Sequence, residues 1–243
     1  MNILLLEPNE VDLAASDVRV GHVRKVLKLG VGGRLRAGIV NGVPGTAVIE
    51  SLDERHMRVR FEPDERSALP GRPDAASPVP VDLLLGHPRP IVLRRLLRDL
   101  STIGIRRLIV TPTELGERSY LGATMWRDIR PLLIEGAAQA GVTRLMEVAR
   151  CDSLAGGIRS AAGADQLRVV LHPTAERNLG AALDDGLAGN LLLAVGSERG
   201  WTGKELEMLT EAGFEVAGMG GRTLRTETAA VVAGWMAITA FAT

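Results

Sequence analysis

The spacing of apolar residues changes part-way along the chain. Over residues 32–52 and 56–61 apolar and polar positions alternate, which predicts short strands, and the stretch "NGVPG" inside the first range predicts a turn. One helical segment is expected around residues 17–29. We therefore expect a small β-rich domain over residues 1–66.

A proline-rich stretch follows. Residues 63–80 hold five prolines and show neither helical nor strand periodicity. This composition is typical of an interdomain linker, which we place at residues 67–79. A long surface loop inside one domain is the alternative.

Residues 80–243 show a different pattern, in which short apolar runs alternate with segments whose apolar residues have helical spacing. Strands are expected at 81–86, 106–113, 168–173, 190–196 and 214–220, and helices at 92–104, 125–141, 177–186, 202–213 and over the C-terminal apolar run. Such alternation predicts an α/β domain with a mostly parallel sheet that is covered by helices on both faces.

Composition narrows the class of protein only a little. The chain of 243 residues has 29 basic and 29 acidic side chains, so its net charge gives no indication of nucleic acid, although basic residues can still gather on one face. The single Cys151 excludes an internal disulfide and a cysteine metal site. The apolar run Ala229 to Ala242 is shorter than the roughly 20 residues that span a bilayer. We expect a cytoplasmic protein without metal catalysis or membrane insertion.

Four strand ends carry unusual residues: 85–90, 171–176, 195–205 and 219–229. In open α/β sheets ligands bind beyond the carboxyl ends of the strands, so these stretches are the candidates for chemistry. The third has glycines that allow close approach of a ligand, but it lacks both the GxGxxG fingerprint and the P-loop lysine pattern. It is equally well read as an ordinary loop, in which Thr202 and Glu205 form a helix capping box.

His87 and His172 each follow a predicted strand beside a proline, where an imidazole can bind a ligand or satisfy a backbone carbonyl. In "RTLRTETAA", Arg222, Arg225 and Glu227 precede the C-terminal apolar run. A well-capped buried helix explains this order, yet two arginines beside such a helix are costly unless they face solvent, a partner or a ligand.

Several motifs of the sequence together resemble those of one protein family. "VGSERG" followed by W-T-x-x-E, then "AGF" and "LRTETAA", resembles the C-terminal half of the RsmE family of small-subunit ribosomal RNA uridine-N3 methyltransferases, in the SPOUT superfamily. "VVLHPTAERNL", "EGAAQAG", "LRRLLRDLSTIGIRRLIVT" and "HVRKVLKLGVGGRL" resemble further stretches of the family in the same order. Nearly the whole chain is covered, and "LRTETAA" is the most specific motif.

The resemblance implies a PUA-like RNA-binding β-barrel at residues 1–66, the linker at 67–79, and a SPOUT methyltransferase domain at 80–243. The second domain is expected to form a C-terminal trefoil knot that binds S-adenosyl-L-methionine, and to pair as a homodimer through the knot. The implied substrate is a uridine of 16S ribosomal RNA, free or in the small ribosomal subunit, and no metal is required.

The resemblance also implies site residues. The cofactor-binding residues expected are Leu171, His172, Pro173, Val195, Gly196, Ser197, Glu198, Gly200, Met219, Gly220, Leu224, Arg225, Thr226, Thr228 and Ala229. Arg225 and Glu227 are the catalytic candidates. The candidates for RNA binding are Arg24, Lys25, Lys28, Arg94, Arg95 and Arg98. Aromatic residues make up only 3% of the chain, which favours recognition of phosphates and shape over stacking along single strands.

The chain departs from the family pattern at a few positions. Ser197 and Arg199 replace a proline and a glycine of the donor loop, and Val142 replaces an arginine. An alternative hypothesis is therefore a non-catalytic or altered-specificity RNA-binding homologue that keeps the knotted dimer. A nucleotide-dependent α/β enzyme of another kind is disfavoured, since neither phosphate-loop pattern is present.

Overall fold

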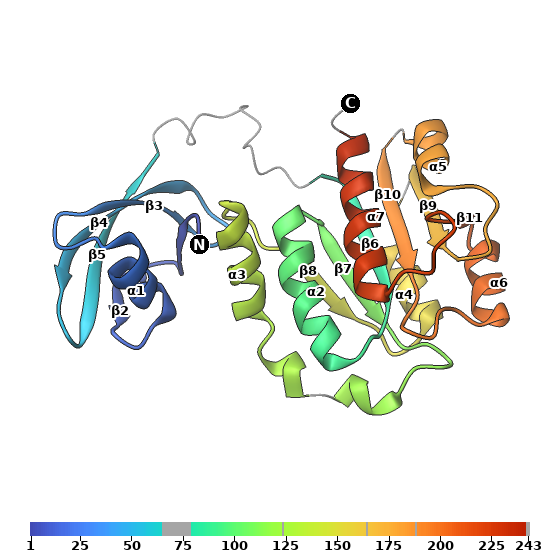
Figure 1. The fold of residues 1–243 in the computed structure, drawn as a ribbon, viewed down its shortest axis with the longest axis horizontal. Coiled ribbons are helices and arrows are strands. Elements are labelled where there is room, and N and C mark those ends of the chain that lie inside the picture. Colours follow the sequence, from blue (N-terminus) through green and yellow to red (C-terminus); the bar gives the residue numbers. More distant parts are fainter. Residues whose placement is uncertain (65–78, 123, 164, 188, 242–243) are drawn as a thin grey trace. The chain divides into compact units, whose positions relative to one another are not determined.

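The chain folds into two compact units (Figure 1). The computed structural model describes residues 1–64, 79–122, 124–163, 165–187 and 189–241. The first unit consists of Met1–Ser77 together with Ile134–Leu145, and the second of Pro78–Leu133 together with Met146–Thr243. Nearly all of the expected linker lies outside the described residues.

The first unit is a small curled β half-barrel. Its elements are β1 (Leu4–Leu6), β2 (Asp12–Ala14), α1 (Val18–His22), the π-helical turn η1 (Val23–Leu27), β3 (Arg34–Ile39), β4 (Pro44–Leu52) and β5 (His56–Pro63). The strand order is β1-β3-β4-β5-β2, with β1 parallel to β3 and the other pairs antiparallel. Leu4, Leu6, Val20, Ile49 and Met57 lie in its core.

A later part of the chain returns to this first unit. Residues Ile134–Leu145 contribute Ala137 and Ala138, which pack against Ile3, Leu5 and Val40. Two backbone hydrogen bonds hold this segment in place. The N–H of Asn41 donates to the carbonyl of Thr143 at 2.8 Å, and the N–H of Asn2 donates to that of Ala138 at 2.9 Å. The boundaries expected from the sequence do not anticipate it.

The second unit is an α/β domain built on a six-stranded, all-parallel sheet. Its elements are β6 (Val81–Gly86), α2 (Pro90–Ile103), β7 (Arg107–Thr111), the 3-10 turns η3 (Arg118–Gly122) and η4 (Thr124–Arg127), α3 (Arg130–Ala140), β8 (Glu147–Arg150), α4 (Leu154–Ala161), β9 (Gln166–Leu171), α5 (Leu179–Gly186), β10 (Asn190–Val195), α6 (Gly203–Glu211), β11 (Glu215–Ala217) and α7 (Thr226–Ala240); the later part of α3 belongs to the first unit. The strand order is β11-β9-β10-β6-β7-β8.

Helices cover both faces of this sheet, as the alternating pattern predicts. Helices α2, α5 and α7 lie on one face and α4 and α6 on the other (Figure 1). Helix α7 follows the edge strand β11 but returns to the middle of the sheet, where it packs against β6 and β10 beside α2. A Cβ at Gly234 would lie 3.1 Å from Ile103 and Ile105, so α7 approaches its neighbours closely. The trefoil knot stays a prediction.

The C-terminal helix buries a face of small residues. Ala230, Ala233, Gly234 and Ala237 are buried, whereas Trp235 is 53% exposed. Helix α7 therefore packs into the core with one face, and its other face is exposed. Among the described residues no helix combines the length and apolar character needed to cross a membrane.

Among the strands and α-helices of the second unit, β8 and α4 were not predicted. Strand β8 lies at the sheet edge and is only partly buried, so it lacks an apolar run. Helix α4 has Gly156 and Gly157 in its interior, which lowers its helix propensity. A Cβ at Gly157 would lie 2.9 Å from Leu84, so close packing on the sheet explains that glycine.

Candidate functional site

Three loops meet at the carboxyl ends of β9, β10 and β11 and enclose one pocket. They comprise residues 171–174, 195–201 and 219–229, and the start of α2 adds Arg89 and Val92. The pocket has a volume of about 780 Å³. Parallel strands place their carboxyl ends at one edge, which is why segments so distant in sequence converge here. Three of the four strand ends that the sequence marks as candidates thus meet at one pocket.

The expected cofactor-binding residues line this pocket, with one exception. Those that line it are Leu171, His172, Pro173, Val195, Gly196, Ser197, Glu198, Gly200, Met219, Gly220, Leu224, Arg225, Thr226 and Ala229. Thr228 does not, because it is exposed in the first turn of α7, roughly 100° around the helix from Glu227. The pocket is also lined by Glu227.

The loop after β10 is a tight turn that favours glycine at two positions. The Gly200 N–H donates to the Ser197 carbonyl at 2.9 Å, and Gly200 has a φ of +71°. A Cβ at Gly196 would lie 2.9 Å from the backbone of Gly200. The backbone of this turn is therefore open toward the pocket, where it can contact a ligand directly.

Two carboxylates tie this turn to neighbouring segments. Glu198 accepts a hydrogen bond from the Arg89 backbone N–H at 2.9 Å, which links the turn to the start of α2. Glu205 is 4% exposed and accepts N–H groups from Thr202 and Glu114, both at 2.8 Å. The capping box that the sequence predicts at Thr202 and Glu205 is confirmed.

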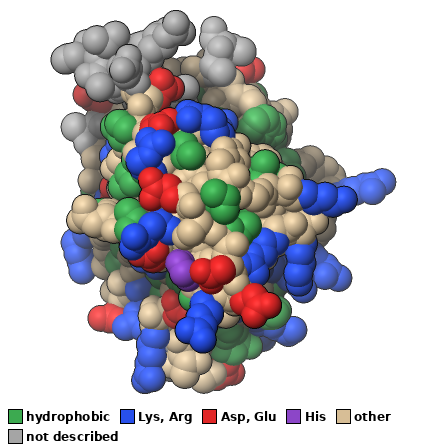
Figure 2. Space-filling model, turned by 90° about the vertical axis from the view of Figure 1, so that its left-hand side faces the viewer, with side chains coloured by type: hydrophobic (Ala, Val, Ile, Leu, Met, Phe, Trp, Pro, Cys, Tyr) green, Lys and Arg blue, Asp and Glu red, His purple; other side chains and the backbone are tan. Residues whose placement is uncertain are grey.

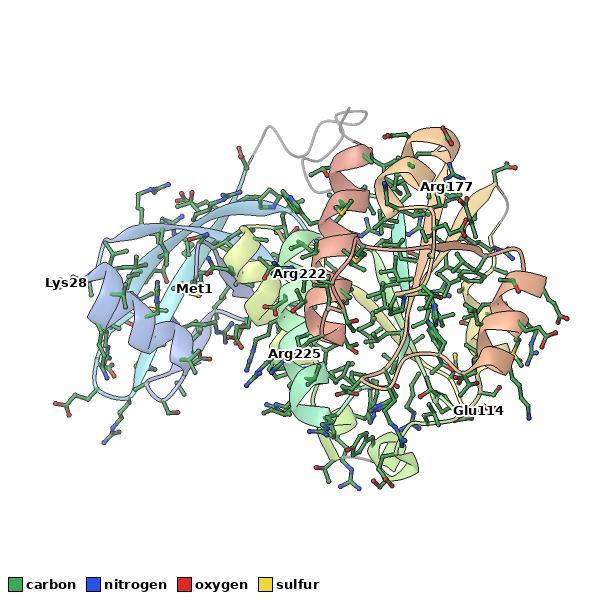
Figure 3. All side chains as sticks on the ribbon, turned by 45° about the vertical axis from the view of Figure 1, so that its right-hand side comes forward. Met1, Lys28, Glu114, Arg177, Arg222 and Arg225 are labelled. Carbon is green, nitrogen blue, oxygen red and sulfur yellow. The ribbon has the colours of Figure 1, made fainter. Side chains whose placement is uncertain are left out.

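Arg225 and Glu227 stand at the beginning of α7 with their charged groups free. Arg225 is the N-cap residue and is exposed (Figure 3). Glu227 lies in the first turn, where a negative charge favours the helix. Neither side chain has a hydrogen-bond or ion-pair partner within the part of the chain that the structure describes. Both are thus available to a ligand in the pocket.

The two histidines have different surroundings. His172 lines the pocket, and its Nδ1 lies 2.8 Å from the Thr174 hydroxyl. His87 is buried outside the pocket, with Nδ1 at 2.7 Å from the Pro88 carbonyl oxygen. The Pro88 carbonyl contact of His87 is of the kind expected for an imidazole that satisfies a backbone carbonyl.

The candidates for RNA binding divide between the two units. Lys25 and Lys28 are exposed, while Arg24 donates to the Asp53 carbonyl (Figure 3 labels Lys28). On α2, Arg94 and Arg95 are exposed and Arg98 is half-buried. On the face that Figure 2 shows, Lys and Arg side chains are interspersed with acidic and apolar ones.

Comparison with known proteins decides the family. Residues 75–237 match the family model described as an RNA methyltransferase domain. The chain is 39% identical to the ribosomal RNA small subunit methyltransferase E of Treponema pallidum, over 96% of this chain and 89% of the relative. The chain belongs to the RsmE family of ribosomal RNA small subunit methyltransferases. The relative from Borreliella burgdorferi is 29% identical over 96% of this chain and 95% of its own length.

Solved structures agree with the RsmE fold. A Legionella pneumophila protein, solved in complex with S-adenosylmethionine, matches with a TM-score of 0.79 at 21% identity and covers 98% of this chain and 97% of its own. The Neisseria gonorrhoeae ribosomal RNA small subunit methyltransferase E, bound to S-adenosylmethionine, matches with 0.75 at 19% identity, over 96% and 95%. At such identities these matches establish the fold of both units.

Two departures from the RsmE motif, Ser197 and Arg199, lie in the loop after β10. Ser197 is 5% exposed, and its hydroxyl lies 3.1 Å from that of Thr113. Arg199 is exposed, and its guanidinium lies 3.5 Å from the Leu115 carbonyl. The pocket is present with both residues in this loop.

Seven lining residues are absent from the predicted cofactor-binding and catalytic residues, namely Arg89, Val92, Thr174, Arg199, Trp201, Arg222 and Thr223. The stretch 85–90 was singled out as an unusual strand end, so the carboxyl-end rule gave a signal for Arg89. Helical spacing alone marks Val92 as a core residue. Trp201 is the last residue of the loop after β10. Its position next to Gly200 in the sequence is the signal that could have identified it as a lining residue.

Proposed function

We propose that this protein transfers the methyl group of S-adenosyl-L-methionine to N3 of a uridine in 16S ribosomal RNA. The observation that carries the proposal is the pocket at residues 171–174, 195–201 and 219–229, with Arg225 and Glu227 unpaired on its wall. It occurs in a chain 39% identical to a ribosomal RNA small subunit methyltransferase. The substrate is the RNA, free or within the small ribosomal subunit, which places the protein in the cytoplasm.

The pocket suits the proposed methyl donor. Its volume of about 780 Å³ lies in the range of small-molecule sites, and its walls consist largely of backbone and short side chains. At Gly196 a Cβ would press on the opposite strand of the turn, so the close approach depends on glycine. Backbone groups of 171–174 and 195–200 would hold the adenosyl part, and the donor, when bound, supplies an electrophilic sulfonium methyl.

The residues of this chain then have defined tasks. The uracil N3 proton must leave so that the nitrogen lone pair attacks the methyl carbon, while the carbon–sulfur bond breaks and S-adenosylhomocysteine departs. We assign to Arg225 the stabilisation of the negative charge that develops on the uracil ring. Glu227, within the same helix turn, either accepts the N3 proton or orients Arg225. Positioning by the closed loops supplies the rest of the rate enhancement.

We further propose that the protein acts as a homodimer. Val232 and Trp235 on α7 are 41% and 53% exposed, although the same helix buries its small residues against the sheet. A second copy packing on this apolar face would cover both side chains and would place the beginning of α7 near the interface.

RNA contact is assigned to basic residues of both units. Lys25 and Lys28 are exposed in the β half-barrel, which we propose as the RNA-binding domain of residues 1–66, and Arg94 and Arg95 are exposed on α2 of the methyltransferase domain at 80–243. Lys and Arg side chains of this kind bind RNA phosphates, so the RNA affinity should fall steeply as the salt concentration rises.

Calorimetric titration of the purified protein with S-adenosyl-L-methionine tests the proposal. We expect saturable binding at one site per chain, unchanged in Arg159→Ala, which alters an exposed arginine on α4. Glu198→Ala should weaken binding, because it releases the turn from Arg89. Absence of binding at millimolar donor would contradict the proposal and favour the non-catalytic RNA-binding homologue.

A further inference from the structure

The pocket proposed for the methyl donor (the donor pocket) has a surplus of positive charge. Four arginines and two glutamates line it, and all four arginines are exposed. None of these arginines forms an ion pair with a carboxylate in the part of the chain that the structure describes. They are Arg89, Arg199, Arg222 and Arg225, of which Figure 3 labels the last two. Their charges are therefore available to an anion.

The methyl donor does not account for this surplus. S-adenosyl-L-methionine carries a sulfonium, an ammonium and one carboxylate, so it is itself a cation. Its carboxylate can pair with one arginine, whereas its two positive groups are repelled by the others. Arg225 is assigned to the charge that develops on the uracil ring. The remaining arginines therefore suit a ligand that is richer in negative charge, and RNA carries such a charge on every phosphate.

Arg199 lies at the tip of the turn after β10. Glu198 and Arg199 are the central residues of this turn, which the Gly200 N–H closes by donating to the Ser197 carbonyl at 2.9 Å. Hydrogen bonds to the loop after β7 and to the start of α2 hold the turn. Because its backbone is already ordered, Arg199 can bind a ligand at a smaller cost in conformational entropy.

The Arg199 guanidinium has little to bind within the protein. Its hydrogen-bond contact within the described chain is to the Leu115 carbonyl at 3.5 Å, which is long for a hydrogen bond. Most of the N–H donors of the guanidinium are thus free, and their planar fork matches two oxygens of a phosphate. The RsmE motif has a glycine at this position, so this chain adds a cation to the wall of the pocket.

The orientation of the target uridine brings its phosphates toward Arg199. N3 belongs to the Watson–Crick edge of uracil, which points away from the ribose. When N3 faces the donor methyl inside the pocket, the ribose and its phosphates lie at the opposite end of the nucleotide, toward solvent. The exposed side chains of the lining are the groups that a phosphate can reach there, and Arg199 is one of them.

We propose that Arg199 binds a backbone phosphate next to the target uridine and so increases the affinity for RNA without taking part in the chemical step. The inference rests on the proposed function, since it requires RNA to enter the donor pocket. Arg89 and Arg222 contribute to the same positive field. Arg199 is thus an RNA-binding residue that this chain has in addition to those of the RsmE motif.

Methylation kinetics at several salt concentrations test the inference. Unmodified 16S ribosomal RNA, free and in small subunits, is titrated between about 50 and 200 mM KCl. Arg199→Gln should raise the KM for RNA about tenfold, with kcat and the Kd of S-adenosyl-L-methionine unchanged. The plot of log(1/KM) against log[KCl] should become shallower by about one, as expected for one lost phosphate contact. Arg199→Lys should keep the parent slope, and Arg159→Ala should match the parent in all three quantities.

Three results would overturn the inference. An unchanged KM and salt slope in Arg199→Gln would show a solvated surface arginine. A weaker donor affinity at an unchanged slope would assign Arg199 to the donor carboxylate, and a lower kcat at an unchanged KM would assign it to the chemical step. A parent protein that transfers no methyl group rejects the proposed function instead. The same salt comparison, made on the Kd for 16S ribosomal RNA with S-adenosylhomocysteine present, then still tests Arg199.

Discussion

The hydroxyl oxygens of Thr113 and Ser197 lie 3.1 Å apart, although the two residues belong to loops that follow different strands. Both side chains are buried. Ser197 occupies a position where the RsmE motif has proline, and it replaces a rigid ring with a hydrogen bond to the neighbouring loop. The loop after β10 is thus held by Thr113 as well as by its own backbone hydrogen bond.

The first prediction concerns this pair. Ser197→Ala leaves the buried Thr113 hydroxyl without its partner, so the free energy of unfolding should fall by about 1–2 kcal/mol. Replacing both partners, as in Ser197→Ala with Thr113→Val, should cost less than the sum of the single changes. Urea unfolding of the four proteins measures this coupling. Strictly additive losses would show that the hydroxyl pair does not stabilise the loop.

The second prediction uses two glycines that differ in the space around them. Gly196→Ala places a Cβ 2.9 Å from the backbone of Gly200, so the turn must open and donor binding should be lost or strongly weakened. Gly203→Ala is the matched control, because it has no neighbouring atom within 4 Å. Calorimetry with S-adenosyl-L-methionine compares them. Equal donor affinities in both variants would refute the claim that backbone approach shapes this pocket.

The third prediction concerns acid stability of the first unit. Burial opposes the charged forms of Glu10 and Asp17, but hydrogen bonds from Arg19 outweigh it and lower the pKa of both carboxyls below 4.5 and 3.8, respectively. A lowered pKa stabilises the fold above the ordinary value and loses this effect as the pH falls through the folded value. The melting temperature should therefore drop below about pH 4.

Glu10→Gln provides the control for this acid effect. The variant should be less stable than the parent protein at pH 7, and the difference in melting temperature should shrink as the pH is lowered toward 2. Thermal scans at several pH values measure it. A difference that stays constant over this range would mean that the charge of Glu10 has no part in the stability.

The fourth prediction addresses the exposed face of α7. Trp235→Glu introduces a charge where a second copy is proposed to pack, so the dimer should dissociate to monomers. Light scattering after size-exclusion chromatography measures the mass. Val18→Glu, which changes a residue 82% exposed in the first unit, should leave the dimer intact. A parent protein that is monomeric at micromolar concentration would contradict the homodimer.

Periodicity predicted the fold where packing follows from sequence spacing. Buried strands such as 81–86 and 190–195 contain continuous apolar runs, at 83–85 and 191–195, because both faces of a parallel sheet are covered. Strand β8 and helix α4 escaped prediction, since an edge strand is half-exposed and Gly157 is explained only by its contact with Leu84. The packing of 134–145 on the first unit depends on contacts distant in sequence.

The candidate site was predicted more completely than the fold around it. The motifs around Gly196 and Arg225 identified most lining residues, because close backbone approach restricts sequence strongly. A second pocket, which lies beside His87, was not foreseen. Its walls combine residues from four segments, of which only 85–90 and 195–205 stand out in the sequence, and the surroundings of the His87 imidazole depend on where Tyr120 and Trp126 lie in the fold.

The most direct measurement is the product of the reaction. Unmodified 16S ribosomal RNA, free or in small subunits, is incubated with the protein and methyl-labelled S-adenosyl-L-methionine, digested to nucleosides and analysed by mass spectrometry. We predict labelled 3-methyluridine from the parent protein and from Arg159→Ala, and at least about a hundredfold less from Arg225→Ala at unchanged donor affinity. Label in a different nucleoside, or none from a protein that binds the donor, would contradict the account.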